Sequence, residues 1–273
     1  MSAHTQTVTA DNVATLFPFV STRLVGEEPT NGASSSDDLA GYDEEQIRLM
    51  DELCIVLTDN DQPLGNASKK DCHLMSNIDG GLLHRAFSVF LFDPKTKKLL
   101  LQQRASEKIT FPDMWTNTCC SHPLFHSSEV GNGDLPSNVE GAKRAAVRKL
   151  DHELGIQSHQ VPVSNFEFLT RIYYKARSDS KWGEHEIDYI LFIEATVDLD
   201  INKNEVQDTR WVSADELKQM FKDVESKTGD DKALKYTPWF KLICEELLFK
   251  WWDALREGQL KEYTNDAEIQ RMS

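Results

Sequence analysis

Apolar runs alternate with polar turn segments along most of the chain, and the runs have the lengths of β-strands. The strands predicted in this way are Cys54–Thr58, His84–Phe92, Lys98–Gln103, Phe166–Tyr174, Glu186–Ala195 and Thr209–Val212. Asp59–Gly65 (DNDQPLG) and Asp93–Lys97 (DPKTK) have turn composition. The second of these turns separates two β-rich runs and therefore predicts a hairpin.

Helical spacing appears in three places. The first helix is predicted to begin at Ser137, with Glu140 completing a capping box, and to end at Gly155. Its apolar positions recur every three or four residues and form one face: Val139, Ala142, Ala146, Leu150 and Leu154. A second helix is expected over Ala214–Phe221 and a third from Pro238 to about Glu257, with a charged loop over 222–235 between them.

This mixed order of strands and helices, with antiparallel hairpins, indicates the α+β class. A chain of 273 residues can hold one large domain, which we expect over residues 41–257. Residues 1–40 have linker-like stretches, including 31–38, and predict a flexible leader in which Leu16–Val20 could dock. Residues 258–273 are predicted to be a C-terminal tail.

Charge narrows the possible functions. The chain has 45 acidic and 30 basic side chains, a formal net charge of −15, which disfavours nucleic-acid binding. An anionic substrate would need a local group of basic residues. Hydrophobic residues make up 40% and charged residues 27%, which excludes a disordered chain.

Cysteine usage and the chain ends predict a cytoplasmic protein. The five cysteines are few and odd in number, and Cys119 and Cys120 are adjacent, which argues against a secreted disulfide framework. The sequence contains no apolar run long enough for a membrane span and no recognisable signal peptide. The last three residues differ from the usual peroxisomal signal, so a peroxisomal location is the less favoured alternative.

Candidate metal chemistry begins at Glu184 and Glu186, which are two residues apart and point to the same face if the segment is extended. Two like charges held together need a cation or a shared proton between them. His73, His84 and His122 could complete a six-coordinate site, although sequence spacing alone cannot bring them together. The alternative interpretation is a solvated strand edge with unrelated structural histidines.

Cys120 is a candidate reactive thiol because His122 follows it two residues later. The alternative is an inert buried thiol. If the segment is extended, Cys119 points in the opposite direction, so only one of the two thiols can line a given pocket.

Residues 134–156 resemble the Nudix box, G-x5-E-x7-R-E-U-x-E-E-x-G-U, where U is a bulky apolar residue. The positions that agree are Glu140, Arg148, Leu150, Glu153, Gly155 and Ile156. Asp134, Lys149 and His152 stand where the pattern has Gly, Glu and Glu. In Nudix hydrolases these glutamates hold the magnesium ions that activate water. The resemblance therefore implies a Nudix fold whose hydrolytic site has been reduced to Glu153.

Four segments together closely resemble the type I isopentenyl-diphosphate isomerases of the Nudix superfamily. They are Leu83–Ser88 (LHRAFS), Thr116–Pro123 (TNTCCSHP), Trp182–Glu186 (WGEHE) and Thr237–Phe240 (TPWF). The likeness implies an α/β/α sandwich around a mixed sheet, with extra helical segments at both ends. It also implies interconversion of isopentenyl and dimethylallyl diphosphate, a supply reaction for isoprenoid and sterol biosynthesis.

This reaction delivers a proton to the terminal alkene carbon and removes one from C2. Because an alkene is a very weak base, the acid must act in a dry pocket that stabilises the cation. By resemblance, Cys120 and Glu186 are the two acid/base groups, and which of them donates first stays open. Tyr174 is implied to hydrogen-bond nearby, and the Trp239 ring to face the developing cation.

The resemblance further implies two metal sites and a diphosphate site. A divalent metal (Mn²⁺, Zn²⁺ or Mg²⁺) is expected on His73, His84, His122, Glu184 and Glu186. Glu153 is implied to help hold a Mg²⁺ bound to the diphosphate. The groups expected to bind the diphosphate itself are Lys69, Arg104, Lys108, Ser121 and Lys149.

Two rival functions stay open. A Nudix diphosphate hydrolase is disfavoured by Lys149 and His152 at its glutamate positions. A catalytically silent module that binds a diphosphate is disfavoured by the retained Cys120, Glu186 and histidines. The substrate is in each case a small diphosphate, with no nucleic acid and no membrane insertion, and a monomer is favoured.

Overall fold

The computed structural model describes residues 7–22, 36–226 and 234–272. Within these residues, ten strands form one mixed β-sheet whose main path has the order β10-β7-β8-β3-β1-β2. The strands are β1 Leu53–Leu57, β2 Pro63–Ser68, β3 His84–Phe92, β4 Leu99–Arg104, β5 Trp115–Thr116, β6 Cys119–Ser121, β7 Glu167–Arg177, β8 Gly183–Glu194, β9 Val206–Val212 and β10 Ile269–Arg271.

Helical elements lie at both ends of the chain and on both sides of the sheet. The α-helices are α1 Val13–Leu16, α2 Glu44–Leu49, α3 Lys69–His73, α4 Met75–Asp79, α5 Leu135–Leu154, α6 Ala214–Ser226, α7 Pro238–Ile243 and α8 Phe249–Arg256. Three 3₁₀ turns, Ser36–Leu39, Val163–Asn165 and Leu260–Tyr263, and one π-helical turn, Cys244–Leu248, complete the described elements.

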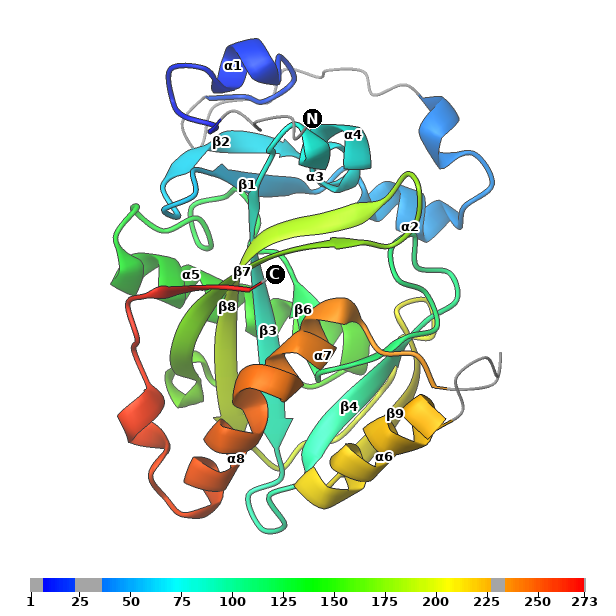
Figure 1. The fold of residues 1–273 in the computed structure, drawn as a ribbon, viewed down its shortest axis with the longest axis vertical. Helices are drawn as coiled ribbons and strands as arrows, with labels where there is room; N and C mark the ends of the chain where they lie inside the picture. Colours follow the sequence, from blue (N-terminus) through cyan, green and yellow to red (C-terminus); the bar gives the residue numbers. More distant parts are fainter. Residues whose placement is uncertain (1–6, 23–35, 227–233, 273) are drawn as a thin grey trace.

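Strand β3 is the centre of the sheet (Figure 1). One edge pairs in parallel with β8 over its whole length, from His84 opposite Glu186 to Phe92 opposite Glu194. The other edge is shared by three segments in turn: β1 pairs at its start, β6 in its middle and β4 at its end. Strand β3 therefore has β8 on one side and β1, β6 and β4 on the other.

Alternation along β8 divides the molecule into layers. Ile187, Tyr189 and Leu191 point to the hydrophobic core that packs against α5. Ile190 and Phe192 point to the second core, which is covered by α7, the π turn and α8. Figure 1 shows α5 on one side of the sheet and α7–α8 crossing the other. The prediction of a sandwich with a mixed sheet is therefore confirmed.

The predicted start of the long helix is wrong. Asp134, not Ser137, is the N-cap: its Oδ1 accepts a hydrogen bond from the Ser137 amide at 2.9 Å. Pro136 fits the first turn because its missing N–H would have no partner there. Glu140 makes no capping bond and pairs with Arg144 at 3.0 Å on the surface. The predicted end is confirmed, since Gly155 adopts a φ of 68°.

Other predicted elements are present with shifted bounds. Strand β3 matches its prediction residue for residue, whereas β8 already begins at Gly183, so that Glu184 is part of the strand. The hairpin between β3 and β4 is confirmed at one pair, Phe92 opposite Leu99. The last helix runs as predicted but contains a π turn. Helix α6 extends into the expected charged loop, and residues 227–233 of that loop lie outside the described residues.

Both chain ends contact the domain more closely than expected. Val13, Phe17 and Val20 are buried against residues of β1 and β2, and Ser21 pairs with Asn66. These residues belong to the predicted leader, of which 1–6 and 23–35 lie outside the described residues. In the predicted tail, β10 pairs in parallel with β7 and extends the sheet. In the described part of the chain, no helix has both the length and the apolar character needed to cross a membrane.

A buried ion network fixes the turn between β1 and β2 to the middle of the sheet. Asp61 is 1% exposed, and its carboxylate accepts hydrogen bonds from Arg85 at 2.9 Å, from Arg171 at 2.8 Å and from the Tyr189 hydroxyl. The three donors come from β3, β7 and β8, so one carboxylate ties the turn to three strands. Removing one partner of such a network leaves buried charges without compensation.

We expect Asp61→Asn to lower the free energy of unfolding by about 3–5 kcal/mol, because two buried guanidinium groups lose their counter-charge. Urea denaturation followed by circular dichroism measures this change. Asp113→Asn is the matched control, since Asp113 shares the left-handed backbone conformation of Asp61 but is exposed. Equal stabilities of the two variants would contradict a structural role for the network.

Candidate active site

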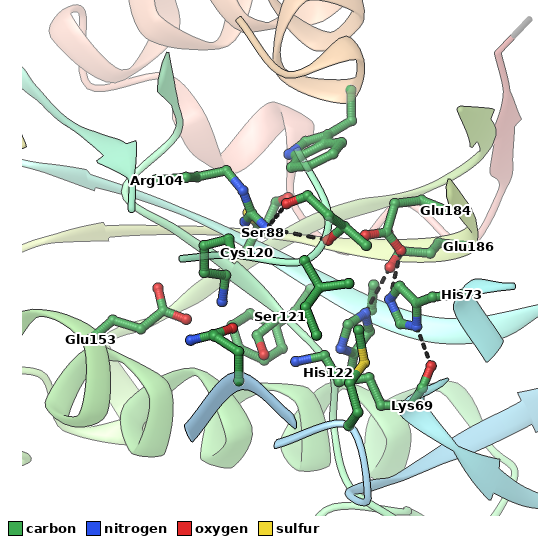
Figure 2. A pocket seen from close by; sticks show the side chains of 18 of the residues that line it. Lys69, His73, Ser88, Arg104, Cys120, Ser121, His122, Glu153, Glu184 and Glu186 are labelled. Carbon is green, nitrogen blue, oxygen red and sulfur yellow. Dashed lines mark hydrogen bonds and ion pairs between the residues drawn. The ribbon is translucent and has the colours of Figure 1, made fainter. Parts of the chain in front are cut away.

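A pocket lies beside the middle of β3, where β6 pairs with it. Its wall is formed by residues of α2, α3, β3, β4, β6, α5, β7, β8 and α7, together with the loop that follows β4. The polar lining residues are Gln46, Lys69, His73, Ser88, Arg104, Lys108, Thr110, Cys120, Ser121, His122, Glu153, Tyr174, Glu184 and Glu186. Figure 2 shows Glu153 and Arg104 on one side of it and His73, Glu184 and Glu186 on the other.

Five buried side chains converge at one end of the pocket: His73, His84, His122, Glu184 and Glu186. One ligand atom from each lies within 4.8 Å of all the others. The fold brings them together by long-range pairing, because β3 places His84 directly opposite Glu186 of β8. His73 is the last residue of α3, and His122 follows β6.

The hydrogen-bond pattern of this group calls for a cation. His73 Nδ1 lies 2.5 Å from the Lys69 carbonyl, which can only accept, so Nδ1 carries the proton. In the neutral ring, Nε2 then presents a lone pair, and it faces Glu184 Oε2 at 2.8 Å. Glu184 Oε2 and His122 Nδ1 are buried without a hydrogen-bond partner. Two acceptors at this distance are stable only with a positive ion or an extra proton between them.

The spacing of the ligand atoms fits a divalent metal. Ligands at about 2.1 Å from a metal and at right angles lie about 3 Å from each other. His73 and Glu184 are 2.8 Å apart, His122 and Glu186 2.8 Å, and His84 and Glu186 3.2 Å. Burial lowers the pKa of His122 well below its usual value, which favours the neutral imidazole that metals bind.

Glu186 is held from two sides. Burial by itself would raise the pKa of this carboxyl, but hydrogen bonding and charge from His84, with the Tyr174 hydroxyl, outweigh it and lower the pKa. Tyr174 donates to Glu186 Oε2, and burial raises the pKa of its phenol well above the usual value. Tyr174 is therefore a hydrogen-bond donor that orients the carboxylate.

Cys120 faces the pocket, while Cys119 points to the opposite core under α5, as predicted for an extended segment. Burial raises the pKa of the Cys120 thiol to about 12, although the Arg104 guanidinium, 3.8 Å from the sulfur, acts in the opposite direction. Cys120 consequently carries its proton at neutral pH. The thiol and the Glu186 carboxylate line one pocket with opposite protonation states.

The Trp239 indole forms part of the apolar wall. Its ring is packed edge-on by Phe111, with centroids 5.1 Å apart, and lies 6.0 Å from the Tyr174 ring. Its Nε1 donates to the Asn117 side chain at 3.3 Å. Because these contacts fix the ring, a π surface of constant orientation lies beside Tyr174 and Arg104.

Arg104, Lys69 and Lys108 bring positive charge to the pocket. The Arg104 guanidinium donates hydrogen bonds to the Phe111 carbonyl and to the carbonyl and hydroxyl of Thr110. It also donates to the Cys120 sulfur. No carboxylate of the described residues lies within 4.0 Å of it, so its charge is available to an anion. Lys69 lies 3.9 Å from Glu52, and Lys108 pairs with Glu205 at 2.6 Å. Ser121 lies on the same wall.

Glu153 reaches the pocket from the last turn of α5, but Lys149 does not line it. The Lys149 ammonium lies behind the wall, 3.2 Å from Glu153, and is 1% exposed. The other four residues expected to bind the diphosphate line the pocket, whereas Lys149 does not. Arg148 of the Nudix-like box does not line the pocket either and pairs with Glu129 at 2.7 Å.

Three residues in or beside the pocket escaped the sequence analysis. Asp188 is the third carboxyl of the alternating series that begins at Glu184, and this alternation could have revealed it; Ser88 donates to it at 2.8 Å. Gln46 lines the pocket from α2, and Glu205 lies just before β9. No spacing rule connects these last two residues to the site, because each reaches it only through the tertiary fold.

Comparison with known proteins identifies the family of this chain. A family model described as NUDIX domain matches residues 82–240. The isopentenyl-diphosphate delta-isomerase of Aspergillus fumigatus is 61% identical, covering 97% of this chain and 96% of its own. The isomerase of Gibberella zeae is 60% identical, covering 98% and 96%, and isomerase 1 of Mus musculus is 48% identical, covering 84% and 96%.

Solved structures overlap only in part. A Deinococcus radiodurans structure matches with a TM-score of 0.45 and 12% identity, covering 72% of this chain and all of its own. An overlap of this size carries no argument about function. The family match and the identity over nearly the whole chain carry the assignment: the chain belongs to the NUDIX domain family and, within it, to the isopentenyl-diphosphate delta-isomerases.

Proposed function

We propose that this protein interconverts isopentenyl diphosphate and dimethylallyl diphosphate. The observation that carries the proposal is the shared pocket of Cys120 and Glu186, with a buried metal-ligand group at one end and free positive charge at the other. A binding module would need the positive charge but not two proton-transfer groups with opposite protonation states. The 61% identity to a relative of that name supports the same substrate.

The reaction adds a proton to C4 of isopentenyl diphosphate and removes one from C2, which shifts the double bond from C3–C4 to C2–C3. One of Cys120 and Glu186 donates the first proton and the other accepts the second. In the reverse direction the two residues exchange these roles, because the transition state is the same. Tyr174 keeps the Glu186 carboxylate oriented throughout.

Protonation at C4 places positive charge on C3. The fixed π face of Trp239 lies beside the two acid/base residues in the wall and stabilises a cation by about 1–2 kcal/mol in a desolvated site. Trp239, Tyr174 and Met50 line the pocket, and in the proposed mechanism their apolar surfaces keep water away from the cation. The diphosphate binds at the other end, where Arg104, Lys69, Lys108 and Ser121 face it.

Two divalent metals fit this scheme. His73, His84, His122, Glu184 and Glu186 would hold Zn²⁺, Mn²⁺ or Mg²⁺, and a cation there shifts the pKa of the bound Glu186 carboxylate. Glu153 would hold a Mg²⁺ shared with the diphosphate, whose charge it helps to neutralise. Lys149 belongs to this end through its ion pair with Glu153.

Hydrolysis of a diphosphate is the rival activity. It requires several box glutamates around magnesium, whereas here Lys149 neutralises the single one that remains, Glu153. The geometry therefore favours proton transfer over water activation. A monomeric state and a cytoplasmic location stay predictions from the sequence.

Cys120→Ala tests the acid/base role. We expect the isomerisation rate to fall by about 10²–10⁴-fold, since one of the two proton-transfer groups is lost. Binding of inorganic pyrophosphate, measured by calorimetry, should stay within about twofold because no phosphate ligand changes. Cys244→Ala, a buried thiol in the C-terminal helix, is the matched control. Full activity of Cys120→Ala would refute the proposed mechanism.

His73→Gln tests the metal site. Removing one of five ligands should weaken metal binding at least about tenfold, measured by competition with a chelator. The same variant should show a smaller rise of the melting temperature on metal addition than the wild type, because ligand binding stabilises the folded state in proportion to affinity. His159→Gln, at an exposed position, is the control. Unchanged metal affinity of His73→Gln would show that the cluster is not the metal site.

A further inference from the structure

Glu205 is a buried carboxylate behind the diphosphate end of the pocket, and the mechanism above gives it no role. It is 2% exposed and lies immediately before β9. Its Oε2 is 2.6 Å from Lys108 Nζ and 3.8 Å from Lys149 Nζ. Its Oε1 accepts a hydrogen bond from Gln46 of α2 at 2.9 Å. Glu205 thus contacts three elements around the pocket without lining it.

The Lys149 ammonium lies between two buried carboxylates, 3.2 Å from Glu153 and 3.8 Å from Glu205. Together with Lys108, these four groups carry two positive and two negative charges, so the cluster is balanced. Gln102 donates to Glu153 at 3.1 Å, and its own buried Oε1 has no partner. The Gln102 Oε1 atom is therefore an unused acceptor beside Glu153, whose carboxylate is already paired with the Lys149 ammonium.

A magnesium ion that binds Glu153 must compete with Lys149, since both positive charges are attracted to the same carboxylate. Lys149 can yield only if another anion receives it. Among the described residues, Glu205 is the one other carboxylate within 4.0 Å of Lys149, and it is also the one that pairs with Lys108. Without Glu205, Lys108 would lose its ion pair, and Lys149 would keep Glu153 at 3.2 Å and the His152 ring nitrogen at 3.0 Å as its partners.

We propose that Glu205 is a positioning residue for the magnesium–diphosphate end of the site. It attracts Lys149 and fixes Lys108, which leaves Glu153 open to magnesium and the Lys108 ammonium oriented toward the diphosphate. The proposal rests on the proposed function, in which Glu153 is the magnesium ligand. Glu205 itself touches neither metal nor substrate.

Glu205→Gln removes the charge and keeps the size of the side chain. In protein whose histidine site is already loaded with metal, we expect the affinity for Mg²⁺ in the presence of inorganic pyrophosphate to fall about tenfold, because an attractive charge is lost and Lys149 stays on Glu153. Calorimetry measures this without turnover. Metal-free pyrophosphate should bind equally well or more tightly, because the net positive charge of the site increases.

Kinetics give a second readout. The Mg²⁺ concentration for half-maximal isomerisation should rise about tenfold, while kcat at saturating Mg²⁺ stays within about twofold. Glu205→Asp, which keeps the charge, should restore most of the Mg²⁺ affinity. Glu129→Gln is the matched control, because Glu129 is buried and paired with Arg148 but does not line the pocket.

A double-mutant comparison tests the route through Lys149. In a Lys149→Met background, Glu205→Gln should change Mg²⁺ affinity clearly less than in the wild type, since the competing ammonium is gone. The double variant Lys149→Met/Glu205→Gln also leaves fewer buried charges uncompensated than Glu205→Gln does. Its Mg²⁺ affinity can therefore be measured even if Glu205→Gln alone fails to fold. Mg²⁺ affinity within twofold of wild type in Glu205→Gln, or an undiminished effect in the Lys149→Met background, would overturn the proposal. A wild-type protein that does not isomerise would instead overturn the proposed function.

Discussion

Compensation of buried charge is the constraint on which this structure depends. Glu184 and Glu186 are buried on one strand face, with Nε2 of His73 2.8 Å from Glu184 and Nε2 of His122 2.8 Å from Glu186. Such a group is stable only with a positive ion or an extra proton between its members. The parallel pairing of β3 with β8 sets His84 opposite Glu186, and the Lys69 carbonyl selects the ring form in which His73 can bind. The sheet therefore brings together a group of side chains that could hold a metal ion.

The same principle separates the two ends of the pocket. At the histidine end, three imidazoles and two carboxylates suit a resident metal. At the diphosphate end, the three positive charges of Arg104, Lys108 and Lys149 outnumber the two negative charges of Glu153 and Glu205. This excess suits an anionic substrate inside an acidic protein. Cys120 contacts Arg104 of the diphosphate end, and Glu186 is part of the histidine end. A five-carbon chain between the ends is thereby exposed to both proton-transfer groups.

Local signals in the sequence predicted local features well. Strand β3 and the glycine end of α5 were predicted to the residue, because a β-rich run bounded by a turn and a left-handed cap depend on neighbouring residues only. The start of α5 was misplaced because Asp134 and Ser137 are both good caps and only the structure shows which one is used. The family motifs brought out the five candidate metal ligands and Cys120, whose convergence no spacing rule could have shown. Glu205 and β10 were missed because their contacts are distant in sequence: Glu205 meets Gln46 across 159 residues, and β10 pairs with β7 from Ile269 to Arg171.

The central claim is that this pocket moves a proton onto C4 and another off C2 of isopentenyl diphosphate. Incubation of the metal-loaded protein with isopentenyl diphosphate and Mg²⁺ in heavy water, followed by proton NMR, tests it most directly. The account predicts dimethylallyl diphosphate with deuterium in a methyl group. Release of inorganic phosphate or an alcohol, or the return of unchanged substrate from folded protein, would contradict it.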